Sequence, residues 1–557
     1  MEINKKGVMD KFENISDGST RLATSDNIKA NDAHEPQTKL RKIDADEKQH
    51  IDLTLNPDLE QKEFTELLCQ NWSNKNTISD YKHSITGAEI YLEPFQLGLI
   101  PDLLQSKDSC KLLVNEMVHK VHWSRKQMDL YEFYQSTDLS NMSDCTMLSQ
   151  FLQMLRRQVC PLLEQVTNLK LDYVSASCSM YTCGDYLLVH DDLLKDRQVA
   201  FVYYLSPWEG AEQWTEEQGG CLEVFNSDNR CLPHFPVRRK IAPKNNQFAF
   251  FKVGSRSFHQ VGEITTFDYP RLSINGWFHG ATNNDLFADT LRPFTKLDFK
   301  APEVLSERLE ELLNEVYLSP NTRQSIQKRI EDNSEICLYE FLKRDIFQQS
   351  LDELLTNNSL KWSRQGPANA QNYEVLELCS ASGTLAQLIK TFSSTEMFAL
   401  LRDYTDLDLD GSDASEPSFS LELQRWSHGN YTVLGDGAIS DENTLDLIYY
   451  LNAVEGAGVI TYLSPEQEEE VGEKVAPAAN KLKRERQSSY TTDGSESEND
   501  LEAEEDDDSV LLTITPIDNS LNIVYRCVGT TKFTKYVSRN TPMDKGPVFV
   551  LSCSYKE

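Results

Sequence analysis

The sequence predicts a mainly β fold with bracing helices (α+β), arranged as two tandem double-stranded β-helix (jelly-roll) domains. Three observations predict this class. Short β-branched and aromatic runs are bounded by turn residues, other segments place apolar residues at helical spacing, and a C-terminal segment resembles an earlier one. At 557 residues the chain is also too long for a single hydrophobic core.

Residues 1–60 are polar and are predicted to form a disordered tail. The basic run Lys39–Lys42 is a weak candidate for nuclear import, although such clusters are more often solvated tails. The first residues, Met1–Gly7, are charged, and no stretch approaches the ~20 apolar residues of a membrane span. Twelve scattered cysteines without a Cys-x-x-Cys pair indicate a reducing compartment. We therefore expect a cytoplasmic and nuclear protein.

Residues 80–290 form the candidate catalytic domain. The apolar spacing of Met147–Leu155 predicts a helix that braces the sheet from outside. Residues 186–189, 199–205 and 248–253 are rich in apolar, β-branched and aromatic side chains and are predicted to be strands. These strands give the polar residues at their ends a rigid scaffold.

Two histidines and one aspartate stand at these strand ends. His190 and Asp192 follow the first strand, and His259 follows the turn after the third. Two imidazoles and one carboxylate can occupy one face of an octahedral iron and leave the opposite face open, as in non-haem Fe(II) oxygenases. Alternatively, they are ordinary polar residues at strand ends. A second His-x-Asp triplet, His50–Asp52, lies in a charge-rich stretch without a predicted strand, so we do not expect it to bind metal.

Arg271 begins a further predicted strand, in which alternation places Ser273 on the same face. A fixed guanidinium can hold a carboxylate through two parallel hydrogen bonds, as a dicarboxylate co-substrate requires. The alternative is that Arg271 pairs with a local acid. Tyr203 and Tyr204 are adjacent and must face opposite ways, and alternation alone does not decide which one lines the pocket.

These motifs resemble those of the 2-oxoglutarate- and iron-dependent oxygenases, and among them the prolyl hydroxylases. The resemblance extends from about residue 80 to the C-terminus. More specifically, the motifs resemble those of the two-domain prolyl 3-hydroxylases that modify a small-subunit ribosomal protein. The motifs that carry it are Tyr181–Tyr186, His190-Asp191-Asp192, Tyr203-Tyr204, His259-Gln260-Val261, and Arg271-Leu272-Ser273 with Trp277.

The resemblance implies a role for each catalytic candidate. Arg271 and Tyr204 would hold the distal carboxylate of 2-oxoglutarate, and Tyr181 would be a second tyrosine near it. The iron ligands would be His190, Asp192 and His259. The implied cofactor and co-substrates are Fe(II), 2-oxoglutarate and O2, with ascorbate as a candidate stimulant. The implied activity is C3 hydroxylation of a prolyl residue in a basic small-subunit ribosomal protein, which would affect translation.

Residues 427–550 look like a degenerate copy of residues 182–280. Their strand and turn residues align in three blocks: Gly429–Gly437 on Gly184–Asp192, Ile448–Leu451 on Val202–Leu205, and Val528–Thr534 on Val253–His259. In this register the positions of His190, Asp192, His259 and Arg271 fall on Gly435, Gly437, Thr534 and the neighbourhood of Gly546. Glycine has no side-chain donor atom and a lone threonine hydroxyl is a poor iron ligand, so this domain should not hold metal.

The two domains are separated by residues 291–370, which are predicted to be a helical connector. Apolar residues recur there at helical spacing, namely Val304, Leu305, Leu309, Leu312, Leu313 and Val316. Residues 371–557 then form the degenerate, non-catalytic domain.

Residues 466–508 hold sixteen acidic and five basic residues, a net charge of −11 within a chain of −33. Such a run cannot bury a core and is predicted to be a disordered insertion. It is either a solubilising loop or an attractant for a basic partner. The negative charge disfavours direct binding to nucleic acid, and no membrane partner is expected.

Two other functions remain open. One is a non-catalytic acidic interaction scaffold with a vestigial metal site, but the complete His-Asp-His set argues against it. The other is an oxygenase for a nucleobase or a small metabolite, for which the basic surface or compact single-domain build is missing.

Deleting residues 470–508 should leave hydroxylation of a short peptide unchanged, because a recruiting loop acts only on a large basic partner. Peptide turnover by mass spectrometry, compared with turnover on the whole partner, measures this. Loss of activity on the short peptide would contradict the recruiting role.

Overall fold

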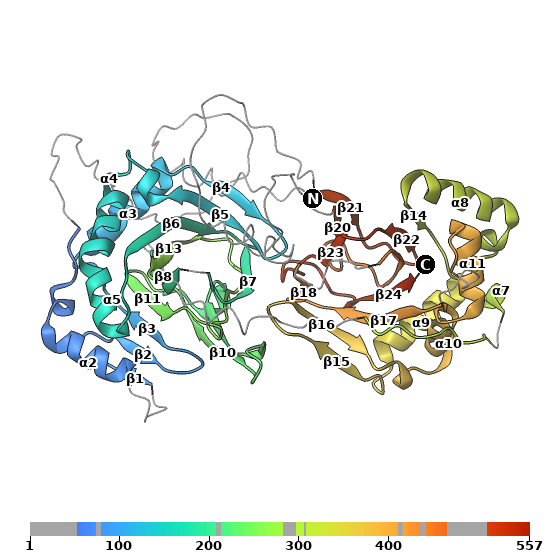
Figure 1. Ribbon diagram of the computed structural model, residues 1–557, viewed down its shortest axis with the longest axis horizontal. Coiled ribbons are helices and arrows are strands. Elements are labelled where there is room, and N and C mark those ends of the chain that lie inside the picture. The colour runs from blue at the N-terminus through green and yellow to red at the C-terminus, as the bar shows by residue number, and fades with distance from the viewer. Residues whose placement is uncertain are drawn as a thin grey trace, which may run out of the picture.

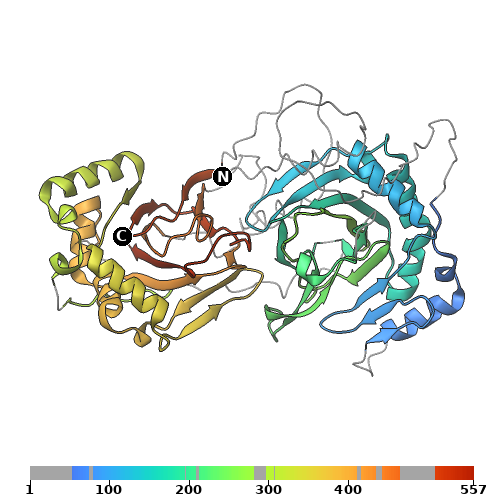
Figure 2. The same cartoon turned by 180° about the vertical axis from the view of Figure 1, so that it is seen from behind.

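The computed structural model describes residues 53–73, 80–194, 196–207, 213–281, 297–305, 308–409, 416–434, 442–464 and 509–556. Two β-sheet domains lie side by side, the first coloured blue to green and the second yellow to red (Figure 1). Their helices lie at the two outer ends, and the sheets face one another in the middle, as the reverse view also shows (Figure 2). The prediction of a mainly β fold with bracing helices, built from tandem double-stranded β-helices, is confirmed.

The first domain contains one sheet of thirteen strands that curves into two facing layers. Its strands are β1 (Tyr81–Lys82), β2 (Glu89–Tyr91), β3 (Leu97–Ile100), β4 (Ser124–Gln127), β5 (Tyr131–Asp138), β6 (Tyr173–Tyr181), β7 (Tyr186–His190), β8 (Arg197–Tyr204), β9 (Leu222–Ser227), β10 (Pro233–Ile241), β11 (Gln247–Lys252), β12 (His259–Val261) and β13 (Arg271–His279). Its helices are α2 (Lys62–Trp72), α3 (Lys107–Lys120), α4 (Thr146–Met154) and α5 (Cys160–Thr167).

The second domain repeats this plan. Its strands are β14 (Glu335–Leu338), β15 (Trp362–Gln365), β16 (Gln371–Leu376), β17 (Phe419–Trp426), β18 (Tyr431–Thr432), β19 (Thr444–Leu451), β20 (Ile460–Leu463), β21 (Val510–Ile514), β22 (Leu521–Arg526), β23 (Thr531–Thr534) and β24 (Val548–Lys556). Its helices are α7 (Leu309–Leu312), α8 (Pro320–Asn333), α9 (Arg344–Thr356), α10 (Gly383–Phe392) and α11 (Thr395–Thr405). None of the helices in the described ranges combines the length and the apolar character of a membrane span.

The outer helices decide which face of the first sheet is the inner one. The predicted helix at 147–155 is α4, and its Phe151 packs on Tyr203 with 4.8 Å between the ring centroids. Because side chains alternate along a strand, Tyr203 points out to the helices and Tyr204 points into the roll. The helices therefore settle the choice that alternation left open.

A buried asparagine links three segments of the first domain. Asn246 adopts a left-handed φ of 63°, which asparagine tolerates better than most residues. Its Oδ1 accepts hydrogen bonds from the Leu104 amide (2.9 Å) and the Tyr203 hydroxyl (2.8 Å), and its Nδ2 donates to the Leu104 carbonyl (2.8 Å). The loop after β3 is thereby fixed to the start of β11.

The second domain makes the same set of bonds. Asn519, with φ 55°, accepts from the Leu342 amide (2.9 Å) and the Tyr449 hydroxyl (2.8 Å), and donates to the Leu342 carbonyl (3.0 Å). The two domains therefore share a scaffold down to single side chains, with β14, β19 and β22 equivalent to β3, β8 and β11.

Strand pairing supports one part of the predicted repeat alignment and corrects another. The amide of Gly184 donates to the Ile264 carbonyl, and that of Gly429 donates to the Val537 carbonyl, each at 2.8 Å. The glycines are thus equivalent, as predicted. Gly435 and Gly437, the expected replacements for two ligands, lie outside the described residues.

The later part of the alignment was shifted by two residues. If Ile264 corresponds to Val537, then His259 corresponds to Lys532 and not to Thr534. Likewise, Arg271 pairs with the last residue of β6 just as Val548 pairs with the last residue of β17, so Arg271 corresponds to Val548, which lies two residues beyond Gly546. The sequence match followed the similar Val-Gly turns, whereas the hydrogen-bonded ladder fixes the true register.

Two predicted domain boundaries need correction. The tail expected for residues 1–60 lies mostly outside the described residues, but residues 53–60 belong to the fold, because Leu55 and Leu59 are buried in the first core. Residues 291–370 are not a separate connector, since from residue 308 onward they supply helices and strands β14 and β15 of the second domain.

The apolar periodicity at 304–316 predicted more helix than this segment contains. It yields only the single turn α7 and a 3-10 turn at Glu315–Leu318, and Val304 and Val316 are exposed. The acidic insertion expected at 466–508 lies outside the described residues.

The second domain packs directly against β7 and the end of β12. The buried Glu263 carboxylate accepts hydrogen bonds from the Tyr536 hydroxyl (3.1 Å), the Ser538 hydroxyl and the Arg539 amide (2.9 Å). The rings of Tyr186 and Tyr536 lie 4.2 Å apart. The strands that carry His190 and His259 are thus held from the far side by the other domain.

Replacing Asn246 or Asn519 by alanine should lower the free energy of unfolding by about 2–4 kcal/mol, because each change leaves buried backbone groups without partners. Thermal or denaturant unfolding of the full chain measures it. Asn358→Ala, at an exposed position, is the control and should change stability by less than about 0.5 kcal/mol. Equal stability of all three variants would refute the role of the shared asparagine.

Candidate active site

His190 and His259 stand directly opposite one another on β7 and β12. The Nδ1 atom of His190 lies 2.8 Å from the Leu188 carbonyl oxygen, and that of His259 lies 2.8 Å from the Ser257 carbonyl oxygen. A ring that donates from Nδ1 to a carbonyl keeps Nε2 as its free lone pair. Both rings therefore present Nε2 to the same point.

Asp192 completes the cluster. Its carboxylate oxygens lie 3.7 Å from the Nε2 of His190 and 3.4 Å from the Nε2 of His259. The three candidate donor atoms all lie within 4.8 Å of one another. Within the part of the chain that the structure describes, no other group of three or more His, Cys, Asp or Glu side chains is placed to hold a metal ion.

The protonation states suit a metal site. Burial and, after it, the neighbouring His259 lower the pKa of His190 to about 4, so the imidazole is neutral near pH 7. Burial alone would raise the pKa of Asp192, but the hydrogen bond with His259 and the neighbouring His190 and Arg197 side chains hold that pKa well below its usual range. Neutral imidazoles and an ionised carboxylate are the forms that bind a divalent cation.

Arg271 lines the same pocket and is only 1% exposed. Its Nη1 donates to the Ser273 hydroxyl at 3.2 Å, and its Nε makes no hydrogen bond within the described residues. The guanidinium carbon lies 5.0 Å from the ring centre of Tyr181 and 5.2 Å from that of Tyr204. A cation between two aromatic faces, with a donor to spare, is prepared for an anion.

The hydroxyl of Tyr204 is the second unsatisfied group at this end of the pocket. It is fully buried and makes no hydrogen bond among the described residues. Burial raises the pKa of Tyr204 to about 12, although Arg271 opposes this, so the phenol stays protonated and can donate. Tyr181 has a different setting, since its ring stacks on Phe133 at 4.7 Å.

The sequence did not single out two residues that belong to this site. Arg197 places Nη1 3.4 Å from an Asp192 oxygen and stacks 3.4 Å over the Trp277 ring. Asn275 lines the pocket, and its buried Oδ1 has no hydrogen-bond partner in the described ranges. Strand alternation from Arg271 through Ser273 could have identified Asn275, whereas nothing local indicated Arg197.

Two family profiles match the chain. The profile described as the 2OG-Fe(II) oxygenase superfamily matches residues 176–279, and the one described as oxoglutarate and iron-dependent oxygenase degradation C-term matches residues 305–557.

Similar proteins include two curated relatives. The prolyl 3-hydroxylase sudestada1 of Drosophila melanogaster is 62% identical over 95% of this chain and 95% of its own length. The prolyl 3-hydroxylase OGFOD1 of Xenopus laevis is 28% identical over 80% of this chain and 84% of its own length. Among solved structures, a prolyl-4-hydroxylase from Pseudomonas putida is 20% identical over 33% of this chain and 91% of its own, with a TM-score of 0.27.

Arg271→Gln should raise the KM for 2-oxoglutarate by roughly tenfold to a hundredfold and change kcat less, because a charge-assisted hydrogen bond contributes about 1.5–3 kcal/mol. Succinate formation at varied 2-oxoglutarate concentration measures it. Arg329→Gln, on the exposed face of α8, is the matched control. An unchanged KM in Arg271→Gln would place the carboxylate anchor elsewhere.

Proposed function

Because the chain belongs to the prolyl 3-hydroxylases of the 2-oxoglutarate- and Fe(II)-dependent oxygenase superfamily, we propose that it hydroxylates C3 of a prolyl residue in a small-subunit ribosomal protein and so affects translation. The chain is a 2-oxoglutarate-dependent prolyl hydroxylase that uses Fe(II) and O2. The observation that carries the proposal is 62% identity with a prolyl 3-hydroxylase along nearly the whole chain.

The residues present fit the cofactor. Three candidate donor atoms lie within 4.8 Å of one another, and the lowered pKa values of His190 and Asp192 give the neutral imidazole and the ionised carboxylate that a divalent cation requires. We assign iron binding to His190, Asp192 and His259. Together they leave coordination positions free, as expected for an oxygenase site with two histidines and one carboxylate.

The co-substrate has an equally suitable place. Arg271 and Tyr204 supply two buried donors without partners, and a carboxylate would satisfy both. We assign them to the distal carboxylate of 2-oxoglutarate, with Tyr181 forming one aromatic wall beside the guanidinium.

The bound iron and 2-oxoglutarate supply the activation of O2 that a C–H bond requires. This chain's own residues supply the setting for it. The carbonyls of Leu188 and Ser257 orient the two imidazoles, and Arg197 holds one oxygen of Asp192. Asp192, His259, Arg271 and Tyr204 are buried, which limits the contact of bulk water with the reacting groups.

The net negative charge of the chain supports a basic protein as its substrate. The chain carries a net −33, including −11 within residues 466–508, and attracts a basic protein over long range. A ribosomal protein has the matching charge, and a chain that acts on it would be needed in the cytoplasm and the nucleus.

The substrate proposal can be tested in cells that lack this chain. Small-subunit ribosomal proteins from these cells should lack one oxygen on a single prolyl residue, and wild-type chain should restore it, as seen by intact-mass and peptide mass spectrometry. Separation of the hydroxyproline isomers distinguishes C3 from C4.

A His259→Ala chain is the control for catalysis, because it keeps the substrate-recruiting surfaces and loses one iron donor. It should restore no hydroxylation. Identical masses for all small-subunit proteins with and without the wild-type chain would reject the ribosomal substrate and leave the prolyl hydroxylase activity standing.

A further inference from the structure

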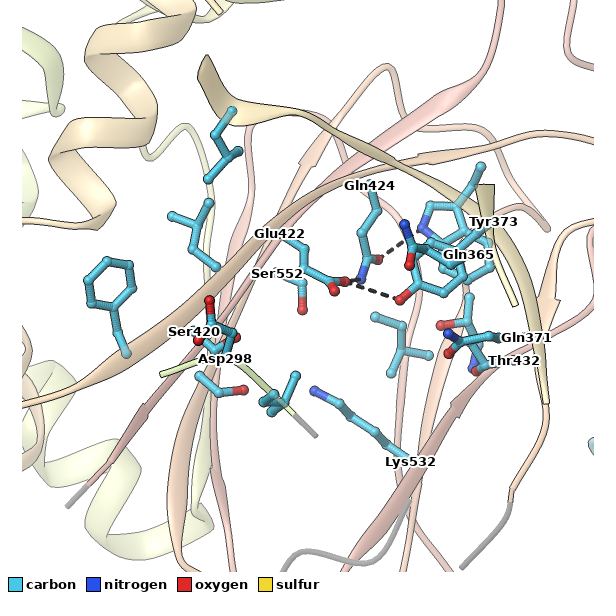
Figure 3. A pocket seen from close by; sticks show the side chains of 18 of the residues that line it. Asp298, Gln365, Gln371, Tyr373, Ser420, Glu422, Gln424, Thr432, Lys532 and Ser552 are labelled. Atoms are coloured by element: carbon cyan, nitrogen blue, oxygen red, sulfur yellow. Dashed lines mark hydrogen bonds between the residues drawn. The ribbon is translucent and has the colours of Figure 1, made fainter. Parts of the chain in front are cut away.

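A large cavity lies in the second domain, away from the His-Asp-His cluster. It holds about 600 Å³, against about 50 Å³ for the cavity at that cluster. Strands β16, β17, β20, β23 and β24 contribute side chains to its wall, which include both charged groups and hydroxyls (Figure 3). A cavity of this size accommodates a small organic molecule.

Lys532 brings a positive charge to this cavity from the position that His259 occupies in the first domain. Its Nζ lies 2.6 Å from Oδ2 of the fully buried Asp446. That carboxylate also accepts hydrogen bonds from the Ser554 hydroxyl at 2.7 Å and the Tyr462 hydroxyl at 3.1 Å. Asp446 is therefore well satisfied, whereas an ammonium group has two further N–H donors to offer.

Arg526 adds a second cation at the same place. It lines the cavity, is only 8% exposed, and its Nε lies 3.8 Å from Asp446 Oδ2, which is too long for a hydrogen bond. This Nε has no hydrogen-bond partner among the described residues. The partly exposed Lys532 and the buried Arg526 thus share one carboxylate, so the part of the wall that they form is positive and suits the carboxylate of a ligand.

The opposite part of the wall carries a fixed acceptor. Glu422 Oε2 accepts from the Tyr373 hydroxyl at 3.1 Å and from Gln424 Nε2 at 2.8 Å, and the Trp426 indole donates to Gln424 at 3.1 Å. In Figure 3 the carboxylate of Glu422 and the ammonium of Lys532 both point into the cavity from different strands. Because both of these bonds use Oε2, Oε1 can accept from a ligand.

We propose that this cavity binds a small organic anion whose carboxylate is held by Lys532 and Arg526 and whose ammonium or hydroxyl group donates to Glu422. A metal ion does not suit the site, since two cations already occupy it. The hydroxyls of Ser552 and Thr432 add polar contacts around the middle of the ligand. This site is separate from prolyl hydroxylation and does not depend on its substrate.

Three probes test the proposal on the full chain without iron, namely L-glutamate, L-malate and glutarate, by titration calorimetry and ligand-observed NMR. Glutamate and malate should bind in the low-millimolar range or tighter, and glutarate, which lacks the extra donor, should bind more weakly. Lys532→Gln and Arg526→Gln should each weaken binding roughly tenfold or more. Glu422→Gln should reduce the preference for glutamate over glutarate.

Three further variants distinguish loss of the site from loss of the fold. Ser552→Phe fills the cavity without removing a charge, so it should block binding even if Lys532→Gln destabilises the fold. Arg271→Gln, which disables the carboxylate anchor in the first domain, should keep binding, as should Lys328→Gln on the exposed face of α8. The proposal is overturned if none of the probes binds the wild-type chain, or if binding is lost in Arg271→Gln and retained in Ser552→Phe.

Discussion

The antiparallel pairing of β7 with β12 is the constraint on which the catalytic site depends. It places His190 and His259 directly opposite one another, so that two rings from distant parts of the sequence can share one ion with Asp192. Both strands are short, at five and three residues, and few ladder hydrogen bonds hold them. The second domain adds contacts that hold these two strands. Tyr536 packs on β7, and residues of the second domain donate hydrogen bonds to the Glu263 carboxylate just after β12.

The two rolls show how one scaffold carries two chemistries. The order β14-β22-β19-β24-β17-β16 repeats the order β3-β11-β8-β13-β6-β5, and Asn246 and Asn519 make the same bonds at the same turn. The two rolls differ in the ionisable side chains that they enclose. The first gathers two imidazoles around one carboxylate, whereas the second places Lys532 at the position of His259 and balances it with Asp446. A fixed ammonium provides positive charge without any need for a metal.

Much of this could be predicted because strand alternation and turn residues act locally. The strand ends that carry His190, His259 and Arg271 followed from pattern alone, and the tandem jelly rolls followed from the repeat. The remaining features depend on contacts far apart in sequence. The packing of α4 on Tyr203 shows that Tyr204 is the tyrosine that faces the pocket, and strand alternation alone could not show this. Lys532 was missed because the alignment followed similar turn sequences and not the strand register. The helical connector was wrong because a short apolar periodicity does not show that the segment pairs with strands of the second domain.

The bond network around Glu263 has a consequence for shortened forms of this protein. A fragment ending after β13 would leave a buried carboxylate, shaped to receive an amide and two hydroxyls, facing water beside an uncovered Tyr186 ring. Truncation would therefore loosen the very strands that carry the histidines. The geometry of the catalytic half therefore depends on the C-terminal half, whatever ligand that half binds.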